Sequence, residues 1–162
     1  MKKLFILLLI IFPFYLSARI YFLDKEYFLC PIEYSRDFII RCDNHGNGFF
    51  AAGRSGRRLH QGIDFFAEIG QPIRAPRSGR VVVAQRSRGM GNFIMLKHPG
   101  KIVTIYGHLS RIDVRKGDFV HQGQVLGAVG KTGNANYRDI QPHLHFEVRK
   151  DGVPQDPLQY LE

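Results

Sequence analysis

The stretch Pro142-His143-Leu144-His145-Phe146-Glu147-Val148 places two histidines one residue apart in a segment rich in strand-forming residues. Side chains alternate between the faces of a strand, so His143 and His145 point the same way. Leu144 and Phe146 share the opposite face and can be buried there. Two imidazoles side by side on a rigid strand suit a site centred on a metal ion. The stretch alone fits a pair of surface histidines equally well, so the interpretation depends on partners elsewhere in the chain.

Around this stretch the chain is dense in turns and short apolar runs. Its 162 residues predict one domain with a real core, and 17 glycines among clusters of valine and isoleucine predict many short strands. The predicted strands are residues 63–66, 80–84, 93–98, 102–106, 119–120 and 125–130, and 38–40 could add another. No long amphipathic helix or sustained repeat interrupts them, so the sequence predicts an antiparallel, all-β fold.

The net charge of +9 and the pI of about 9.8 favour an anionic partner or surface. Charge alone does not distinguish nucleic acid, anionic lipid and cell-wall polyanions, and a basic surface without a specific ligand also fits. No RNA-binding aromatic motif or helix-turn-helix pattern favours nucleic acid, so we expect none as a partner.

The N-terminus has the layout of a secretory signal peptide. Lys2 and Lys3 precede an apolar run over residues 4–14, and small residues follow, ending at Ala18. The run is short for a membrane span, although an uncleaved anchor remains an alternative. We expect cleavage after Ala18, export to the periplasm, cell envelope or exterior, and membrane contact only through this segment. The predicted organisation is a signal peptide (1–18), a lead-in segment (19–48) and a domain (49–162).

The two cysteines lie in the predicted lead-in segment. In an oxidising compartment, a disulfide between Cys30 and Cys42 would close a short loop and contribute about 2–3 kcal/mol. Neither cysteine belongs to a Cys-x-x-Cys pair, which argues against zinc binding. The alternative is two free or buried thiols.

The remaining candidates for a metal site lie in two places. His60 and Asp64 are four residues apart, and the glycine-rich approach argues for a loop that delivers both to one point rather than for a helix. Their nitrogen and oxygen are both zinc donors. His108 ends a buried-looking strand, which could aim it into a groove. The histidines expected to be exposed and passive in loops or turns are His45, His98 and His121.

Four elements together resemble the lysostaphin/LytM-type zinc endopeptidases, the M23 peptidase family, over about residues 49–162. These elements are His60-x-x-x-Asp64, Tyr106-x-His108-Leu109, Gly130-Lys131-Thr132-Gly133 and His143-x-His145-Phe146. The resemblance implies a compact antiparallel β-sheet module, similar to a duplicated hybrid motif, with a substrate groove over the metal site. It implies an enzyme that hydrolyses peptide bonds in peptidoglycan. We expect a monomer, although nothing in the sequence determines the oligomeric state.

The resemblance also assigns roles to individual positions. His60, Asp64 and His145 match the ligands of one Zn²⁺ per chain, and His108 and His143 match the two histidines that act on the attacking water. Three protein ligands leave one position open, as in catalytic rather than structural zinc sites. Which of His108 and His143 takes the proton and which supports the oxyanion stays open.

One segment departs from the family pattern. Residues 134–141 form a longer connection than the family's usual one and lead directly into His143, so they should border the groove. Tyr137 and Arg138 could contact substrate there, or the loop could simply be a longer surface loop. A catalytically silent wall-binding or activator module on the same fold is the main alternative function. A biotinyl/lipoyl-like carrier is a weaker one, because no modified lysine sits at a hairpin tip between matching arms.

Overall fold

The computed structural model describes residues 24, 27–34, 37–54 and 56–161. The expected signal peptide lies outside them. Twelve strands and three short 3-10 turns make up this part of the chain. The strands are β1 (Cys42–Asp43), β2 (Gly46–Asn47), β3 (Ile63–Phe66), β4 (Pro72–Arg74), β5 (Gly79–Ser87), β6 (Gly91–His98), β7 (Ile102–Leu109), β8 (Arg111–Ile112), β9 (Phe119–Val120), β10 (Val125–Ala128), β11 (His143–Lys150) and β12 (Val153–Gln155). The turns are η1 (Pro99–Lys101), η2 (Gly133–Ala135) and η3 (Pro157–Gln159).

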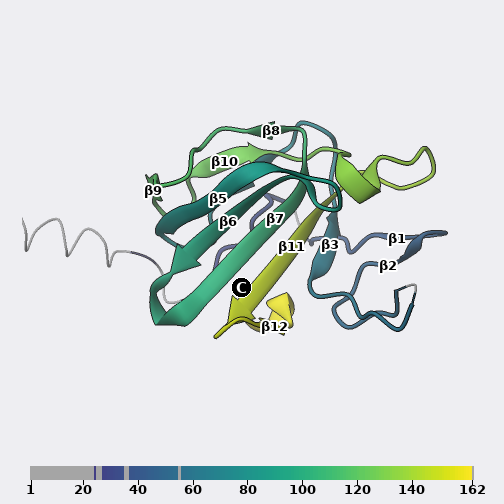
Figure 1. Ribbon diagram of the computed structural model, residues 1–162, viewed down its shortest axis with the longest axis horizontal. Helices are drawn as coiled ribbons and strands as arrows, with labels where there is room; N and C mark the ends of the chain where they lie inside the picture. The colour runs from purple at the N-terminus through teal and green to yellow at the C-terminus, as the bar shows by residue number, and fades with distance from the viewer. Residues whose placement is uncertain (1–23, 25–26, 35–36, 55, 162) are drawn as a thin grey trace, which may run out of the picture.

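A twisted antiparallel sheet forms the body of the domain (Figure 1). Its strand order is β12-β11-β7-β6-β5-β9, and β3 pairs with the first half of β11 on the side away from β7. A smaller sheet, β4-β10-β8, lies against it, and β1 and β2 form a separate hairpin. The expected antiparallel all-β fold is confirmed, and β11 sits between the two strands that carry the other candidate site residues.

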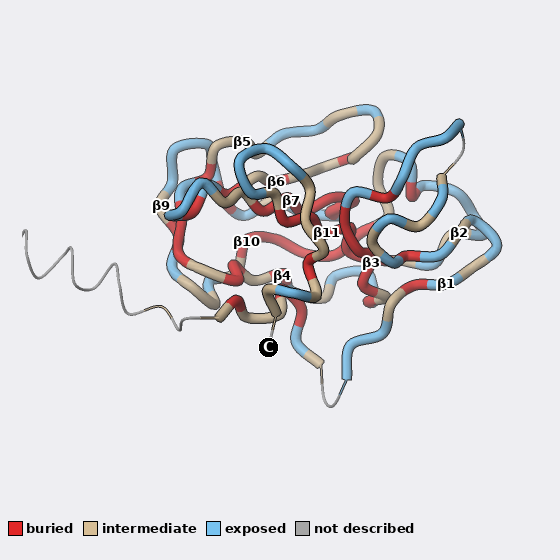
Figure 2. Tube along the Cα trace, turned by 90° about the horizontal axis from the view of Figure 1, so that it is seen from below, coloured by how far each residue is buried: buried red, intermediate tan, exposed pale blue. Residues whose placement is uncertain are grey.

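The core lies between the main and the smaller sheet, where the buried trace of β6, β7, β10 and β11 gathers (Figure 2). Tyr106, Phe65 and Phe146 are its largest fully buried side chains. The apolar face of β11 that the sequence predicts opposite the two histidines is confirmed, since Leu144 and Phe146 are fully buried. Burying both faces makes β11 a rigid support for its histidines.

Part of the lead-in segment belongs to the domain. Phe28 and Ile32 are buried, and Ile40 pairs with Phe65 of β3 through an isolated antiparallel bridge. Only this bridge, not a full strand, forms at the expected 38–40 strand. A domain limit at residue 49 would therefore remove side chains that complete the core and cover the edge of β3.

One other expectation about this region is wrong, and one about β7 is met. The expected Cys30–Cys42 disulfide is absent, since both are free: Cys30 packs half-buried against the core, while Cys42 is exposed on β1. The strand expected over residues 102–106, with His108 at its end, is β7, which runs to Leu109. Its extension brings His108 to the edge shared with β11.

His98 is also not an exposed turn residue. It ends β6 at the position where the predicted strand 93–98 also ends, and it is only 3% exposed, because Phe28 of the lead-in segment covers its ring. Its Nδ1 lies 2.9 Å from the carbonyl oxygen of Ser78, and its Nε2 lies 2.8 Å from Thr104 Oγ1. His45 and His121 are exposed as expected.

Acid should destabilise the protein through His98. Burial, partly offset by the hydrogen bond to Ser78, lowers the pKa of His98 from its ordinary 6.5. Between the two pKa values the unfolded chain binds more protons, so the free energy of unfolding should fall as pH drops below about 6.5. Urea unfolding of wild type and His98→Gln at pH 7.5 and 5.5 measures this, with the variant losing less stability than wild type. Equal losses would contradict it, and exposed His121→Gln should behave like wild type.

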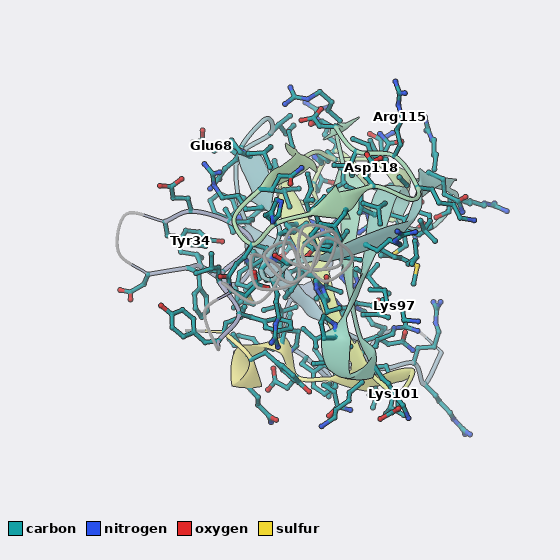
Figure 3. All side chains as sticks on the ribbon, turned by 90° about the vertical axis from the view of Figure 1, so that its left-hand side faces the viewer. Tyr34, Glu68, Lys97, Lys101, Arg115 and Asp118 are labelled. Carbon is teal, nitrogen blue, oxygen red and sulfur yellow. The ribbon has the colours of Figure 1, made fainter. Side chains whose placement is uncertain are left out.

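Charged side chains cover the outside of the sheets. Lys97, Lys101 and Arg115 project away from the body of the molecule (Figure 3), in line with the net charge of +9. Within the described ranges, no helix has the length and apolar character needed to cross a membrane.

Candidate metal centre and groove

Strand register brings the candidate site residues together. On β11, His145 lies opposite Asp64 of β3 on one side and opposite Gly107 of β7 on the other. His60 precedes β3 in a loop held by two backbone hydrogen bonds, from Ala51 to His60 and from His60 to Ala52. Residues that are 81 to 85 positions apart in the chain therefore meet at one point.

Three atoms that could bind a metal ion converge there. His60 Nε2 lies 3.0 Å from His145 Nδ1, His145 Nδ1 lies 2.9 Å from Asp64 Oδ1, and His60 Nε2 lies 3.1 Å from the same oxygen. Tetrahedral bonds of about 2.0–2.1 Å would separate neighbouring ligand atoms by about 3.3 Å. The triangle is thus close to the size that one zinc ion requires, and all three side chains are buried.

Hydrogen bonds at the far sides of the rings set which nitrogen faces the centre. His60 Nδ1 lies 2.9 Å from the carbonyl oxygen of Phe49, so this nitrogen carries the proton and Nε2 is an acceptor. His145 Nε2 lies 3.0 Å from Glu147 Oε1, which leaves Nδ1 facing the centre. Such partners hold metal-binding histidines in orientation and tautomer. Because two nitrogen lone pairs and a carboxylate oxygen then point at each other, only a positive charge can satisfy them.

The carboxylates make this point favourable for a cation. Burial raises the pKa of Asp64, but the hydrogen bond from His145 and the close contact with His60 outweigh burial and hold that pKa well below its usual range. Burial lowers the pKa of His145, but hydrogen bonds to Asp64 and Glu147 outweigh burial and raise it to about 9. Without a metal, a proton on His145 supplies the positive charge. A metal ion would replace that proton at the same place.

His108 and His143 face each other beside this centre, with ring centroids 5.0 Å apart. His108 Nδ1 lies 2.8 Å from the carbonyl oxygen of Thr132, and His143 Nδ1 lies 2.7 Å from that of Gln141. In both, Nδ1 donates and Nε2 is left for the groove. Burial lowers the pKa of both rings, that of His108 to about 3 with help from the neighbouring His145 and His143.

The backbone at His108 adopts a conformation that is unfavourable for a residue with a Cβ. Its φ of 65° is in the left-handed region, which residues with a Cβ rarely adopt. The surrounding contacts hold it there: its amide donates to the carbonyl of Met90, and its ring to Thr132. Unusual backbone of this kind gathers at functional sites, where packing maintains a required side-chain direction.

A groove of about 590 Å³ runs over these residues. All five expected site residues line it, and so do Asn134, Ala135 and Ile140 of the longer connection. The expectation that this connection borders the groove is confirmed. Tyr137 and Arg138 are exposed but are not among the described residues that line the groove.

Sequence reasoning did not identify four charged residues of the site. Glu147 is buried and joins His145 to Arg149; its position two residues after His145, on the same strand face, could have revealed it. Arg41 and Arg54 both lie against Asp64 Oδ2, and Asp43 pairs with Arg41. The last three come from segments before the recognisable motifs, where no spacing indicated them.

Gly62 should be essential for holding His60 and Asp64 together. The loop crosses β11 so closely here that a Cβ would overlap the carbonyl oxygen of Phe146. We expect Gly62→Ala to cost about 1–3 kcal/mol in the free energy of unfolding, measured by urea denaturation. Gly53→Ala is the matched control, because a Cβ there meets nothing within 4 Å. Equal urea midpoints for Gly62→Ala and wild type would show that the close approach does not matter.

Known proteins resemble this chain in sequence and in structure. The model of Peptidase family M23 matches residues 58–157. A lipoprotein NlpD/LppB homolog of Pseudomonas aeruginosa is 42% identical over 115 residues, which cover 70% of this chain and 36% of that protein. The DD-carboxypeptidase/endopeptidase Mpg of Neisseria meningitidis is 42% identical over 101 residues, covering 62% of this chain and 22% of that protein.

A solved structure shows the same architecture. The catalytic domain of lysostaphin from Staphylococcus simulans superposes with a TM-score of 0.60 at 37% sequence identity. The match covers 74% of this chain and 90% of that domain. The chain spans well under half the length of both curated relatives above.

Proposed function

The chain belongs to peptidase family M23, and we propose that it is an exported, zinc-dependent endopeptidase that cuts peptide bonds in the stems or cross-links of peptidoglycan. The observation that carries this proposal is the convergence of three buried acceptor atoms, from His60, Asp64 and His145, beside two further histidines in an open groove. A purely structural role would not require two buried imidazole nitrogens to converge on one carboxylate oxygen.

His60, Asp64 and His145 would hold one zinc ion. Two imidazoles and one carboxylate are the donor set of several catalytic zinc sites, and three protein ligands leave a position open towards the groove. Zinc bound there would supply Lewis acidity to the attacking water and to the scissile carbonyl. Glu147 supports His145 from its far side and keeps Nδ1 as the metal-facing atom.

His143 and His108 would move and hold protons. The carbonyl of Gln141 fixes His143 with Nε2 towards the groove, where it can take a proton from the attacking water. The carbonyl of Thr132 does the same for His108, whose Nε2 can hold the water or, once protonated, donate to the developing oxyanion. Burial keeps both rings neutral before the reaction, as a proton acceptor must be.

The substrate and the location rest on further support. The Neisseria relative is named a DD-carboxypeptidase/endopeptidase, and lysostaphin is described as an antimicrobial peptidase. The net charge of +9 suits an anionic cell wall, and the basic, apolar N-terminus has the layout of an export signal.

Digestion of defined cross-linked muropeptides tests the proposal. The purified protein is incubated with dimers joined directly through a D-amino acid and with dimers joined by a glycine bridge, and products are read by mass spectrometry. We expect cleavage of one class, its loss with chelator and its return with added zinc. Zinc binding without cleavage of either dimer or of isolated sacculi would instead favour a silent binding or activator module.

A further inference from the structure

We propose that Arg41 and Asp43 of the lead-in segment are positioning residues that tie the metal-binding side of the site to the histidine that takes the proton. Both precede residue 58, where the match to the family model begins. The inference rests on the proposed function, since it concerns how Asp64 and His143 are held relative to each other.

The first half of the connection reaches Asp64. Arg41 Nη2 lies 3.0 Å from Asp64 Oδ2, and both side chains are about 5% exposed or less. Arg54 Nη2 lies 3.2 Å from the same oxygen. The other oxygen, Oδ1, faces His60 and His145. The two guanidinium groups therefore occupy one carboxylate oxygen, Oδ2, and leave the other, Oδ1, directed to the metal centre.

The second half reaches His143. Arg41 Nη1 lies 2.6 Å from Asp43 Oδ1, and Asp43 Oδ2 accepts a hydrogen bond of 3.1 Å from the backbone amide of Gln141. The carbonyl of Gln141 is the acceptor for His143 Nδ1. An unbroken series of hydrogen bonds therefore runs from Asp64 through Arg41, Asp43 and Gln141 to His143.

The backbone holds Arg41 firmly in this place. Its amide donates to the carbonyl of Asp64 at 2.8 Å, and its own carbonyl accepts from Gly48 at 2.8 Å. Gly48 packs so closely that a Cβ there would lie 2.7 Å from Arg41 O and 2.9 Å from Asp64 Cβ. Lead-in residues thus lie directly against β3, beside Asp64, and cannot shift independently of it.

Burying Arg41 costs free energy of folding, and packing alone does not explain why an arginine stands here. Arg41 Nε is buried and, within the described residues, finds no hydrogen-bond partner. An unpartnered buried donor costs about 1–3 kcal/mol. An arginine is nevertheless the one side chain whose planar fork can hold two carboxylates at fixed directions, which the point charge of lysine cannot do. We therefore attribute Arg41 to alignment of the site.

Different variants break different parts of the connection. Arg54→Gln removes a second contact to Asp64, and also one to the carbonyl of Asn47. Asp43→Asn weakens the link from Arg41 to Gln141 and leaves the Arg41–Asp64 pair in place, and Arg41→Gln breaks both halves. Arg111→Gln is the matched control, because Arg111 and Asp113 form an exposed arginine–aspartate pair with the same two-residue spacing. For each protein, zinc affinity is measured by competition with a chromophoric chelator, the ligand field by the absorption spectrum after cobalt substitution, and kcat and KM on the muropeptide that wild type cleaves.

We expect Arg41→Gln to weaken zinc binding about 10–100-fold, to alter the cobalt spectrum and to lower kcat. Asp43→Asn should lower kcat about 10-fold or more with KM, zinc affinity and the cobalt spectrum near wild type. Arg54→Gln should change zinc affinity and the spectrum, Arg41→Lys should not restore the wild-type values, and Arg111→Gln should match wild type throughout.

Zinc affinity and cobalt spectrum unchanged in Arg41→Gln, or kcat unchanged in Asp43→Asn, would overturn the inference while leaving the proposed function intact. Wild-type protein that neither binds zinc nor cleaves muropeptides would instead refute the proposed function. If Arg41→Gln does not fold by circular dichroism, Asp43→Asn and Arg41→Lys decide, since the first weakens the link to Gln141 and the second keeps the charge without the planar fork. Full recovery by Arg41→Lys would show that charge alone, not alignment, is needed.

Discussion

His145→Ala protein is expected to bind no zinc and to cleave no peptidoglycan peptide, while remaining folded. The imidazole of His145 contacts both other members of the ligand triangle, at 3.0 Å from His60 Nε2 and 2.9 Å from Asp64 Oδ1, and it comes from the central strand of the site. Losing an outer partner of a metal ligand typically costs 10–100-fold in affinity or activity, and losing the ligand itself should cost more than about 100-fold.

The measurement is zinc content per chain after gel filtration, together with muropeptide cleavage. Circular dichroism checks folding. We expect the variant to fold, because the change leaves Leu144 and Phe146 on the other face of β11 untouched. His121→Ala, at an exposed position outside the groove, should keep its zinc and its activity. A His145→Ala protein with one zinc per chain would contradict the assignment.

His143→Ala should behave in the opposite way, keeping zinc but losing turnover. His143 shares a strand face with His145, yet its Nδ1 donates to the carbonyl of Gln141 and its Nε2 is turned to the groove rather than to the ligand triangle. Removing a positioned proton acceptor lowers kcat by about 10²–10⁴-fold. His108→Ala should show the same pattern, because its ring is held in the same manner by Thr132.

Stopped-flow or discontinuous assays that separate kcat from KM give the required measurement, with zinc content determined on the same samples. We expect kcat to fall by a larger factor than KM changes, since these rings act on the reacting groups rather than on the rest of the substrate. Loss of zinc from either variant would overturn the division between metal-holding and proton-moving histidines.

The candidate site residues were accessible from sequence because strand alternation and motif spacing are local properties. Alternation put His143 and His145 on one face, and the structure brings them to His60, Asp64 and His108. Turn residues and apolar runs also located β3, β5, β6, β7, β9 and β10 along the chain, but not their order in the sheet. The roles of these residues as ligands and proton carriers stay predictions that the two experiments above address.

What could not be predicted depends on contacts between distant segments. His98 looked like an exposed turn residue, but it is covered by Phe28, 70 positions earlier in the chain. Arg41 had no motif around it, and only the pairing of the lead-in segment with β3 places it on Asp64. Likewise, the two cysteines are free because Cys30 packs against the core while Cys42 lies on an exposed hairpin.

Anomalous diffraction from crystals of the zinc-loaded protein, collected on both sides of the zinc absorption edge, tests the central claim most directly. The account predicts one strong anomalous peak per chain, within bonding distance of His60 Nε2, Asp64 Oδ1 and His145 Nδ1 and open to the groove. A peak at any other set of side chains, or none at this triangle in crystals that contain zinc, would contradict it.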